Sequence, residues 1–443
     1  MMRTIDIRGA GELTRAEIEE LLPRAQLGVD AVLGHVGPLL EDIATRGAAA
    51  LADQAIRFDK VAPPEVRVPP RVAREALARL DGEVRAALEV SIERVRRVHA
   101  AQAPPDHTVE LAPGALVSQR WIPVRRVGLY VPGGLVAYPS SVVMNVVPAQ
   151  VAGVRELAVA SPPRPECGGW PRPQVLAACA LLGVEEVYAA GGVSAIGLFA
   201  YGVPGVAEKV DVVTGPGNVY VAAAKRLVMG RVGIDAEAGP TEIAVVADAA
   251  ADPELVAADL VSQAEHDPLA AAVLITDSPE LAERVASAVA RRAKATRHAE
   301  RVGRALRGRQ SAIVLVDSLA AAIAVANVYA AEHLELQVAD AAAAAEAIHS
   351  AGAIFVGPTS PVSLGDYLAG SNHVLPTGGA ARFASGLGVM AFLRSVQQIE
   401  YSAAALGDVA PLIAALAGSE DLPAHGEAAL ARAAGGAGRR VSP

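Results

Sequence analysis

The first quarter of the chain carries the hydrophobic spacing of helices. Thr14 and Glu17 form a capping-box pattern directly ahead of a run with apolar positions three or four residues apart. The same spacing returns further along, at Val84, Leu88, Ile92, Val95 and His99. We therefore predict a helical region over residues 1–105, which packs on the rest of the chain or on a partner subunit. Two consecutive prolines, Pro104 and Pro105, mark its end.

From residue 126 onward, short β-type runs alternate with helical runs. The expected strands are 126–131, 156–160, 185–189 and 210–214, and the expected helices between and after them are 142–154, 174–182 and 219–225. Such alternation predicts a parallel sheet covered by helices, and we assign it to a first α/β domain over residues 106–237. Ligands of such sheets lie beyond the C-terminal strand ends, where glycine-rich turns occur here.

The alternation restarts after Pro240. Strands are expected at 242–247, 271–276, 311–316 and 353–356, with helices at 253–265, 279–294 and 319–329. We predict a second α/β domain over residues 238–381 and a helical C-terminal region over 382–443. The expected fold class is thus α/β, with two Rossmann-like parallel-sheet domains and helical terminal segments that mediate dimerisation.

Composition and charge exclude several classes of protein. The formal net charge is −9 and 52% of the residues are hydrophobic, which argues against disorder and against nucleic-acid binding. Cys167 and Cys179 are the only cysteines, so we expect no disulfide framework and a reducing, cytoplasmic location. Charged Asp6 and Arg8 precede any apolar run, and no apolar stretch is long enough for a membrane span, so neither a signal peptide nor membrane insertion is expected.

A pair of polar side chains stands at the end of one predicted helix. Gln263 and His266 are three residues apart, a spacing that puts both on one helix face. An amide oxygen and an imidazole nitrogen together suit Zn²⁺, although glutamine is an uncommon zinc ligand. The competing interpretation is a polar helix end.

Three further segments gather titratable side chains among apolar or glycine-rich surroundings. Glu332 and His333 are adjacent, Asp366 and His373 lie in one glycine-bounded run, and Glu420 precedes His425 near the C-terminus. Residue types of this kind in turns are typical of an active site. For Glu332 and His333 the alternative is a polar loop on the surface, and for His425 it is a helix cap.

The turn Gly215-Pro-Gly-Asn218 stands between a predicted strand and a predicted helix. Glycines there let the backbone approach a phosphate, and a helix N-terminus favours anions. Tyr220 occupies the position where a dinucleotide fingerprint has its third glycine, so a plain tight turn remains the alternative.

The motifs occur in an order that resembles histidinol dehydrogenase. The resemblance extends from the first predicted helix to about residue 430, and its parts are Tyr130-Val-Pro-Gly-Gly134, Tyr138-Pro-Ser-Ser141, Gly215-Pro-Gly-Asn218, Ala238-Gly-Pro-Thr-Glu242, Gln263-Ala-Glu-His266, Glu332-His333, Gly365-Asp-Tyr367 and Asn372-His373. The family then implies a zinc-dependent homodimer that oxidises L-histidinol twice, through L-histidinaldehyde to L-histidine, with NAD.

The resemblance also assigns residues. In the family, positions matching Tyr130 and Asn218 contact NAD, as does a glutamine whose place Ser194 takes here, so that contact is shorter or lost. The implied zinc ligands, for one ion per subunit, are Gln263, His266, Asp366 and His425, with His425 supplied by the other subunit. This makes 106–237 the NAD domain, 238–381 the zinc and substrate domain, and 382–443 the region that reaches the partner.

The family's acid/base pair matches Glu332 and His333. A neutral imidazole has a pKa near working pH and suits removal of an alcohol proton, and a carboxylate suits activation of water. The implied substrate contacts are Thr241, Gln263, His266, His333, Asp366, His373, Glu420 and His425. Thr241 replaces a common serine and keeps its hydroxyl, and Ala331 replaces a common proline.

Three other functions compete with this interpretation. A paralogue would use the same zinc and NAD parts on another polar alcohol. A zinc hydrolase would use Gln263, His266 and Glu332 around a metal-bound water. A non-catalytic two-lobed binding protein would not need the acid/base pair.

Overall fold

The computed structural model describes residues 2–11, 13–22, 24, 28–133, 136–237 and 239–435. Gly134 and Ala238, which end or begin two of the motifs above, lie outside these ranges. The contacts divide the chain into a first unit, Met1–Gln102 with Val124–Phe392, and a second unit, Ala103–Pro123 with Leu393–Pro443. The four-part division at residues 105, 237 and 381 stays a prediction.

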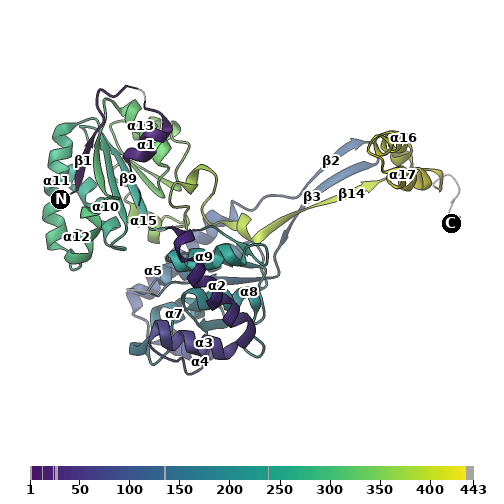
Figure 1. The fold of residues 1–443 in the computed structure, drawn as a ribbon, viewed down its shortest axis with the longest axis horizontal. Helices are drawn as coiled ribbons and strands as arrows, with labels where there is room; N and C mark the ends of the chain where they lie inside the picture. Colours follow the sequence, from purple (N-terminus) through teal and green to yellow (C-terminus); the bar gives the residue numbers. More distant parts are fainter. Residues whose placement is uncertain are drawn as a thin grey trace. The chain divides into compact units, whose positions relative to one another are not determined.

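The first unit contains two parallel sheets, as the alternation of strands and helices predicts (Figure 1). The first sheet has five strands in the order β6-β5-β4-β7-β8. Their bounds are β4 (Arg126–Tyr130), β5 (Glu156–Ser161), β6 (Glu186–Ala189), β7 (Val212–Thr214) and β8 (Gly233–Ile234). Each neighbouring pair of these strands is parallel.

Helices cover both faces of the first sheet because successive strand residues point to opposite sides. Val127 and Leu129 lie in a core cluster with residues of α6 (Pro139–Val151) and α7 (Pro173–Leu181). Ala158 and Ala160 lie in another cluster with α8 (Gly192–Tyr201) and α9 (Val219–Val228).

The predicted N-terminal helices cover these layers. The elements are α2 (Val29–Arg46), α3 (Ala48–Gln54), a short π-helix η1 (Ala55–Asp59), α4 (Pro70–Ala78) and α5 (Gly82–Ala100). α2 packs on α8 and α9, α4 on α7, and α5 on α6. Asp81 caps α5 through its side chain, and Leu88 and Val95 form the buried face of that helix.

The second sheet has six parallel strands in the order β1-β11-β10-β9-β12-β13. They are β1 (Arg3–Asp6), β9 (Glu242–Ala247), β10 (Ala271–Thr276), β11 (Ala312–Leu315), β12 (His333–Gln337) and β13 (Ala353–Val356). The prediction of a purely helical N-terminal region is wrong at β1, which pairs with β11 more than 300 residues later in the sequence. Pairing at such a separation leaves no local signature in the chain.

Two groups of helices cover the second sheet (Figure 1). Ile243 and Val245 pack with α10 (Pro253–Ala264), α11 (Pro279–Ala295) and α12 (Ala299–Arg307). Ala244 and Val246 face the other way, toward α1 (Arg15–Leu21), α13 (Leu319–Tyr329) and α14 (Ala341–Glu346). The unit is completed by α15 (Val362–Tyr367) and the single turns η2 (Pro165–Cys167), η3 (Ala380–Arg382) and η4 (Val389–Phe392).

The second unit is an antiparallel sheet with a helix pair. β3 (Ala115–Pro123) pairs with β2 (His107–Ala112) and with β14 (Leu393–Tyr401), and α16 (Ala403–Ser419) packs on α17 (Pro423–Gly435). The expectation that residues 382–443 are helical throughout is therefore wrong at β14. That strand is mostly exposed and polar, so its sequence lacks the apolar alternation of a half-buried strand.

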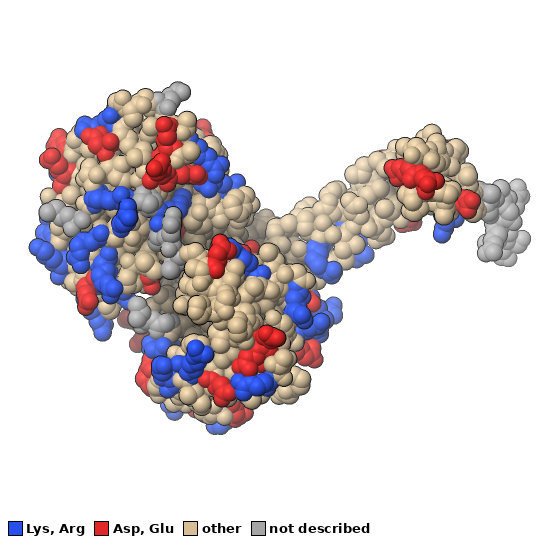
Figure 2. Space-filling model, viewed as in Figure 1, with Lys and Arg blue, Asp and Glu red and all other residues tan. Residues whose placement is uncertain are grey.

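Charged side chains of both signs are interspersed on the visible face of the first unit (Figure 2). In the described part of the chain, no helix combines the length and apolar character that crossing a membrane requires.

Candidate active site

A cavity of about 1200 Å³ in the first unit is lined by residues of both sheets. The first sheet contributes its C-terminal strand ends, as predicted: Tyr130 is the last residue of β4, and Pro216 follows β7. The second sheet contributes its N-terminal ends instead, because Thr241 directly precedes β9 and His333 opens β12. The rule that ligands lie beyond C-terminal strand ends therefore describes the first sheet and not the second.

Three side chains form a hydrogen-bonded chain, and two of them, Thr241 and Glu332, line this cavity. The Gln263 amide Nε2 donates to Thr241 Oγ1 at 2.6 Å, and that hydroxyl donates to Glu332 Oε2 at 2.5 Å. The main-chain N–H of Glu242 also donates to Glu332 Oε2, at 2.9 Å. Glu332 Oε2 therefore accepts two hydrogen bonds from the start of β9, and Gln263 of α10 supports one of them through Thr241.

Burial sets the protonation of the neighbouring acid and base. Burial raises the pKa of Glu332 to about 7. The hydrogen bonds from the Thr241 hydroxyl and the Glu242 N–H lower this pKa, but burial is the larger effect. Burial also lowers the pKa of His333 below its usual value, so this imidazole is neutral near pH 7. His333 Nδ1 lies 3.2 Å from the Glu242 carbonyl oxygen, which fixes the proton on Nδ1 and leaves Nε2 as the basic nitrogen.

The chain reaches this geometry through a left-handed residue at the end of α13. Ala330 has φ of 48°, and the following residues turn directly into β12. His333 is the first residue of that strand, which corrects the expectation that Glu332 and His333 both lie in a turn. Gly352 packs against this turn so closely that a Cβ there would lie 2.5 Å from the Glu332 carbonyl oxygen.

Asp366 lies between two imidazoles of the cavity. Its Oδ2 is 4.0 Å from His266 Nε2, and its Oδ1 is 3.9 Å from His373 Nδ1. His373 Nδ1 also lies 3.0 Å from the Asp366 carbonyl oxygen, and its Nε2 lies 3.1 Å from Ser141 Oγ of α6. The loop that carries His373 is thereby held against the first sheet's helix layer.

Gln263, His266 and Asp366 are the first-unit residues that the resemblance assigns to zinc. Gln263 Oε1 is buried and has no hydrogen-bond partner, which is unusual for an amide oxygen in a polar site. Zn²⁺ suits a donor set made of the Gln263 amide oxygen, the His266 imidazole and the Asp366 carboxylate. Within the described ranges, no group of three or more His, Cys, Asp and Glu side chains is arranged for a metal.

Gln263 and His266 do not share a helix face, contrary to the expectation from their spacing. α10 ends at Ala264, and His266 lies in the following turn, where its N–H donates to the Gln263 carbonyl oxygen at 3.3 Å. Both residues still lie at the C-terminal end of α10.

The Gly-Pro-Gly-Asn turn is built around a buried ion pair. Lys225 of α9 is 1% exposed and pairs with Asp235. Lys225 Nζ donates to the Gly215 carbonyl oxygen at 3.1 Å, and the Gly215 N–H donates to Asp235 Oδ2 at 2.8 Å. Gly215 has φ of 120°, and a Cβ there would meet the Tyr130 carbonyl oxygen at 2.0 Å, so only glycine fits. Asn218 caps α9, which places a helix N-terminus at the cavity.

The other cofactor candidates lie on the same side of the cavity. Tyr130 Oη accepts the Gly192 N–H at 3.2 Å. Ser194 is 6% exposed, and its hydroxyl donates to Gln54 Oε1 at 2.8 Å, so a protein partner already engages it. Asp59 of the π-helix also lines the cavity, and burial raises its pKa to about 6.

Glu420 and His425 belong to the second unit. Glu420 directly follows the last residue of α16, and His425 lies in the first turn of α17. The lining of the cavity consists of first-unit residues.

Sequence reasoning missed several residues of the site. Ser141 was quoted in a motif without a role, although it contacts His373. Glu242 was treated as the end of a motif, although its main chain contacts both Glu332 and His333. A carboxylate at the first position of an otherwise apolar strand was the available signal for Glu242.

Known proteins resemble this chain over almost its whole length. A family model described as Histidinol dehydrogenase matches residues 22–433. The histidinol dehydrogenase of Nocardia farcinica is 58% identical over 432 residues, which cover 97% of this chain and 97% of that protein. The histidinol dehydrogenase of Mycobacterium tuberculosis strain H37Rv is 59% identical over 432 residues, with the same coverage of 97% for each. The crystal structure of histidinol dehydrogenase from Elizabethkingia anophelis aligns with a TM-score of 0.90 and 32% identity, over 97% of this chain and 98% of that chain.

Proposed function

The chain belongs to the histidinol dehydrogenase family, the NAD-dependent oxidoreductases of histidine biosynthesis, and we propose that its cavity oxidises L-histidinol twice, through L-histidinaldehyde to L-histidine. The observation that carries this proposal is the joint position of Glu332 and His333 in one cavity with the Gly215 turn. An acid/base pair beside a phosphate-binding turn is what hydride transfer from an alcohol to NAD⁺ requires.

The first oxidation removes a proton from the alcohol oxygen and a hydride from the carbon. His333 takes the proton, because its Nδ1–H is held by the Glu242 carbonyl oxygen and its Nε2 is free to accept. Burial keeps this imidazole neutral at working pH. Residues at the C-terminal edge of the first sheet would hold NAD⁺, which would supply the hydride acceptor.

The second oxidation adds water to the aldehyde and removes a second hydride. Glu332 takes the proton of the attacking water, since a carboxylate with a pKa of about 7 is a competent base near neutral pH. The hydrated aldehyde would give one O–H proton to the acid/base pair and one hydride to a second NAD⁺, which forms the carboxyl group of L-histidine. Holding the aldehyde in a water-restricted cavity protects it from side reactions between the two steps.

We propose one Zn²⁺ per subunit, held by Gln263, His266 and Asp366 together with His425 of a second copy. The buried and unpartnered Gln263 Oε1 supports this assignment. When bound, Zn²⁺ would supply a redox-inert Lewis acid that orients the substrate. Thr241 then has two tasks, since its hydroxyl orients the Gln263 amide and contacts the substrate.

The remaining assignments combine position in the cavity, for His373, Tyr130, Asn218 and Ser194, with the family resemblance, for Glu420 and His425. His373 contacts the substrate from the side of α6, and Glu420 of the second copy contacts it together with His425. Tyr130 and Asn218 bind NAD at the C-terminal edge of the first sheet. Ser194 is the weakest NAD candidate, because its hydroxyl already donates to Gln54.

A homodimer with shared active sites supplies what one chain lacks. The second unit exposes large apolar side chains on its strands and helices, namely Val109, Leu111, Ile399, Leu412, Leu416, Leu422 and Leu430. An apolar surface of this kind on a small sheet and helix pair is typical of an obligate subunit interface. A second copy of the chain is the partner that we propose, in the cytoplasm, where its free cysteines Cys167 and Cys179 stay reduced.

NADH formation separates this proposal from its alternatives. The purified chain with Zn²⁺ and NAD⁺ should produce NADH from L-histidinol, and His333→Ala should not. NADH from a different polar alcohol, but not from L-histidinol, would indicate a paralogue. Hydrolysis without NADH, or binding without turnover, would contradict the proposal in favour of a zinc hydrolase or a binding protein.

A further inference from the structure

One residue, Glu242, holds both members of the acid/base pair through its main chain. Its N–H donates to Glu332 Oε2 at 2.9 Å, and its carbonyl oxygen accepts from His333 Nδ1 at 3.2 Å. This contact follows from the sheet, because β9 and β12 are parallel neighbours with His333 paired to Ile243. A shift of the chain at residue 242 therefore moves the acid and the base together.

The side chain of Glu242 is buried and is held from the opposite direction. It is 2% exposed, and the Gly378 N–H donates to its Oε1 at 3.1 Å. Arg24 Nη1 makes an ion pair with the same oxygen. The Arg24 guanidinium also lies over the Tyr329 ring, 4.0 Å from its centroid. A buried carboxylate without such a cation would be strongly unfavourable at this position.

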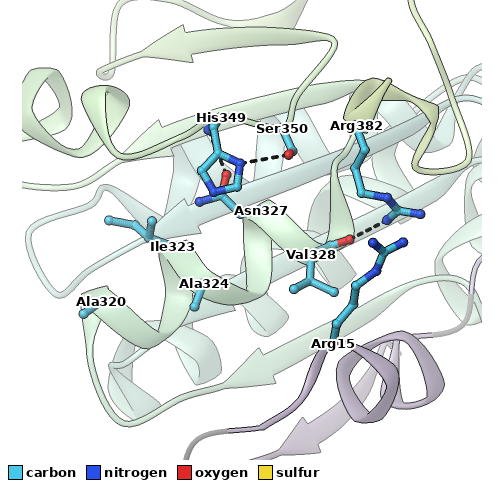
Figure 3. A pocket seen from close by; sticks show the side chains of 9 residues that line it. All are labelled: Arg15, Ala320, Ile323, Ala324, Asn327, Val328, His349, Ser350 and Arg382. Carbon is cyan, nitrogen blue, oxygen red and sulfur yellow. Dashed lines mark hydrogen bonds between the residues drawn. The ribbon is translucent and has the colours of Figure 1, made fainter. Parts of the chain in front are cut away.

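Arg24 is supplied by the N-terminal segment, which is attached to the second sheet by its own contacts. Ile18 and Leu22 of this segment, each 5% exposed, pack in the core beneath α13. Arg382 pairs with Glu19 at 3.3 Å and donates to the Val328 carbonyl oxygen at 2.9 Å. Figure 3 shows Arg382 and Arg15 converging beside Val328, at the place where this segment meets α13. The position of Arg24 is therefore set by packing that does not involve the cavity.

We propose that Arg24 is a positioning residue for both oxidations. Its guanidinium neutralises the Glu242 carboxylate and thereby fixes the main chain of residue 242, which in turn sets the Glu332 carboxylate and the His333 imidazole relative to the substrate. This inference rests on the proposed function. It adds that Arg24 positions the acid/base pair through Glu242. Arg24 itself does not line the cavity, so it acts on kcat and not on binding of either substrate.

The test compares Arg24→Gln and Arg24→Lys in the full chain with bound zinc. For Arg24→Gln, kcat should fall about 100-fold for L-histidinol and for L-histidinaldehyde alike, with KM for both and for NAD⁺ nearly unchanged, as expected for a displaced acid/base pair. Arg24→Lys keeps a cation at the single bonded oxygen and should recover most of this loss. Arg15→Gln is the matched control, because Arg15 opens α1 and pairs with Glu19 but has no bond to Glu242.

The melting temperature and zinc content of each variant keep the outcomes distinct. Arg24→Gln that is folded and zinc-loaded with wild-type kcat on both substrates would overturn the inference. The same holds if its melting temperature falls while kcat per folded molecule is unchanged, since Arg24 would then be merely structural. Absence of activity in the unmodified chain would instead count against the proposed function.

Discussion

The Gln263 side chain donates its Nε2 hydrogen to Thr241 Oγ1 at 2.6 Å and leaves its Oε1 buried without a partner. The hydroxyl that accepts this bond passes its own hydrogen to Glu332. The amide is thus oriented from the acid/base side, and its buried oxygen is left available to a further partner. This single orientation connects the proposed metal ligands to the proposed chemistry.

The first prediction concerns zinc. His266→Ala should weaken zinc affinity at least about 100-fold, because removal of a ligand costs more than loss of its supporting hydrogen bond. His333→Ala is the matched control, since it removes a nearby imidazole that contacts the Glu242 carbonyl and is not an assigned ligand. Metal analysis after dialysis measures the difference. Full zinc retention in His266→Ala would remove His266 from the ligand set.

The second prediction concerns pH. Burial raises the pKa of Glu332 from 4.5 to about 7, so its carboxylate form, which is the base, is populated only as the pH rises through that value. Oxidation of L-histidinaldehyde should fall about tenfold per pH unit below this point and level off above it. Thr241→Val removes a hydrogen bond that lowers this pKa, so the profile should move to higher pH. A profile that is flat through pH 7, or that moves downward in Thr241→Val, would contradict the role of Glu332.

The third prediction tests the shared site by subunit mixing. His333→Ala and His425→Ala homodimers should each be inactive. A mixed dimer then contains one site with both defects and one intact site, so an equal mixture should regain about one quarter of wild-type activity. A mixture that remains inactive after confirmed subunit exchange would place both histidines in sites made by one chain.

The fourth prediction concerns the cofactor turn. Lys225→Met leaves Asp235 buried without its cation and releases the Gly215 carbonyl oxygen. KM for NAD⁺ should rise about tenfold, with KM for L-histidinol nearly constant, because the turn is displaced while the second sheet is not. Arg226→Gln is the control, since this neighbour pairs with Glu237 outside the turn. An unchanged KM for NAD⁺ in folded Lys225→Met would show that the ion pair does not position the cofactor.

The sequence predicts well what is encoded locally. The apolar runs of β9 and β10 and the helix between them required only periodicity, and both sheets are parallel as the alternation indicates. The Gly215 turn was recognisable because glycine has a specific backbone role there. The family resemblance is confirmed by the match to residues 22–433.

Long-range pairing accounts for what the sequence did not predict. β1 joins β11, and Arg24 reaches Glu242 across more than 200 residues, without any local pattern that marks either contact. β14 is an exposed strand in a segment that was predicted to be helical. It forms because β3 supplies its hydrogen-bond partners, and its own residue pattern does not indicate a strand. His333 was expected in a turn, although His333-Leu-Glu-Leu-Gln337 alternates polar and apolar residues as a strand does, and that signal was missed.

In the proposed mechanism, one cavity carries out both oxidations. The most direct test is to count NADH against L-histidinol consumed by the purified, zinc-loaded chain in the presence of a reagent that traps free aldehyde. Two NADH and one L-histidine for each L-histidinol, with no trapped aldehyde, is the predicted result. One NADH per L-histidinol, with the aldehyde recovered in the trap, would contradict the claim.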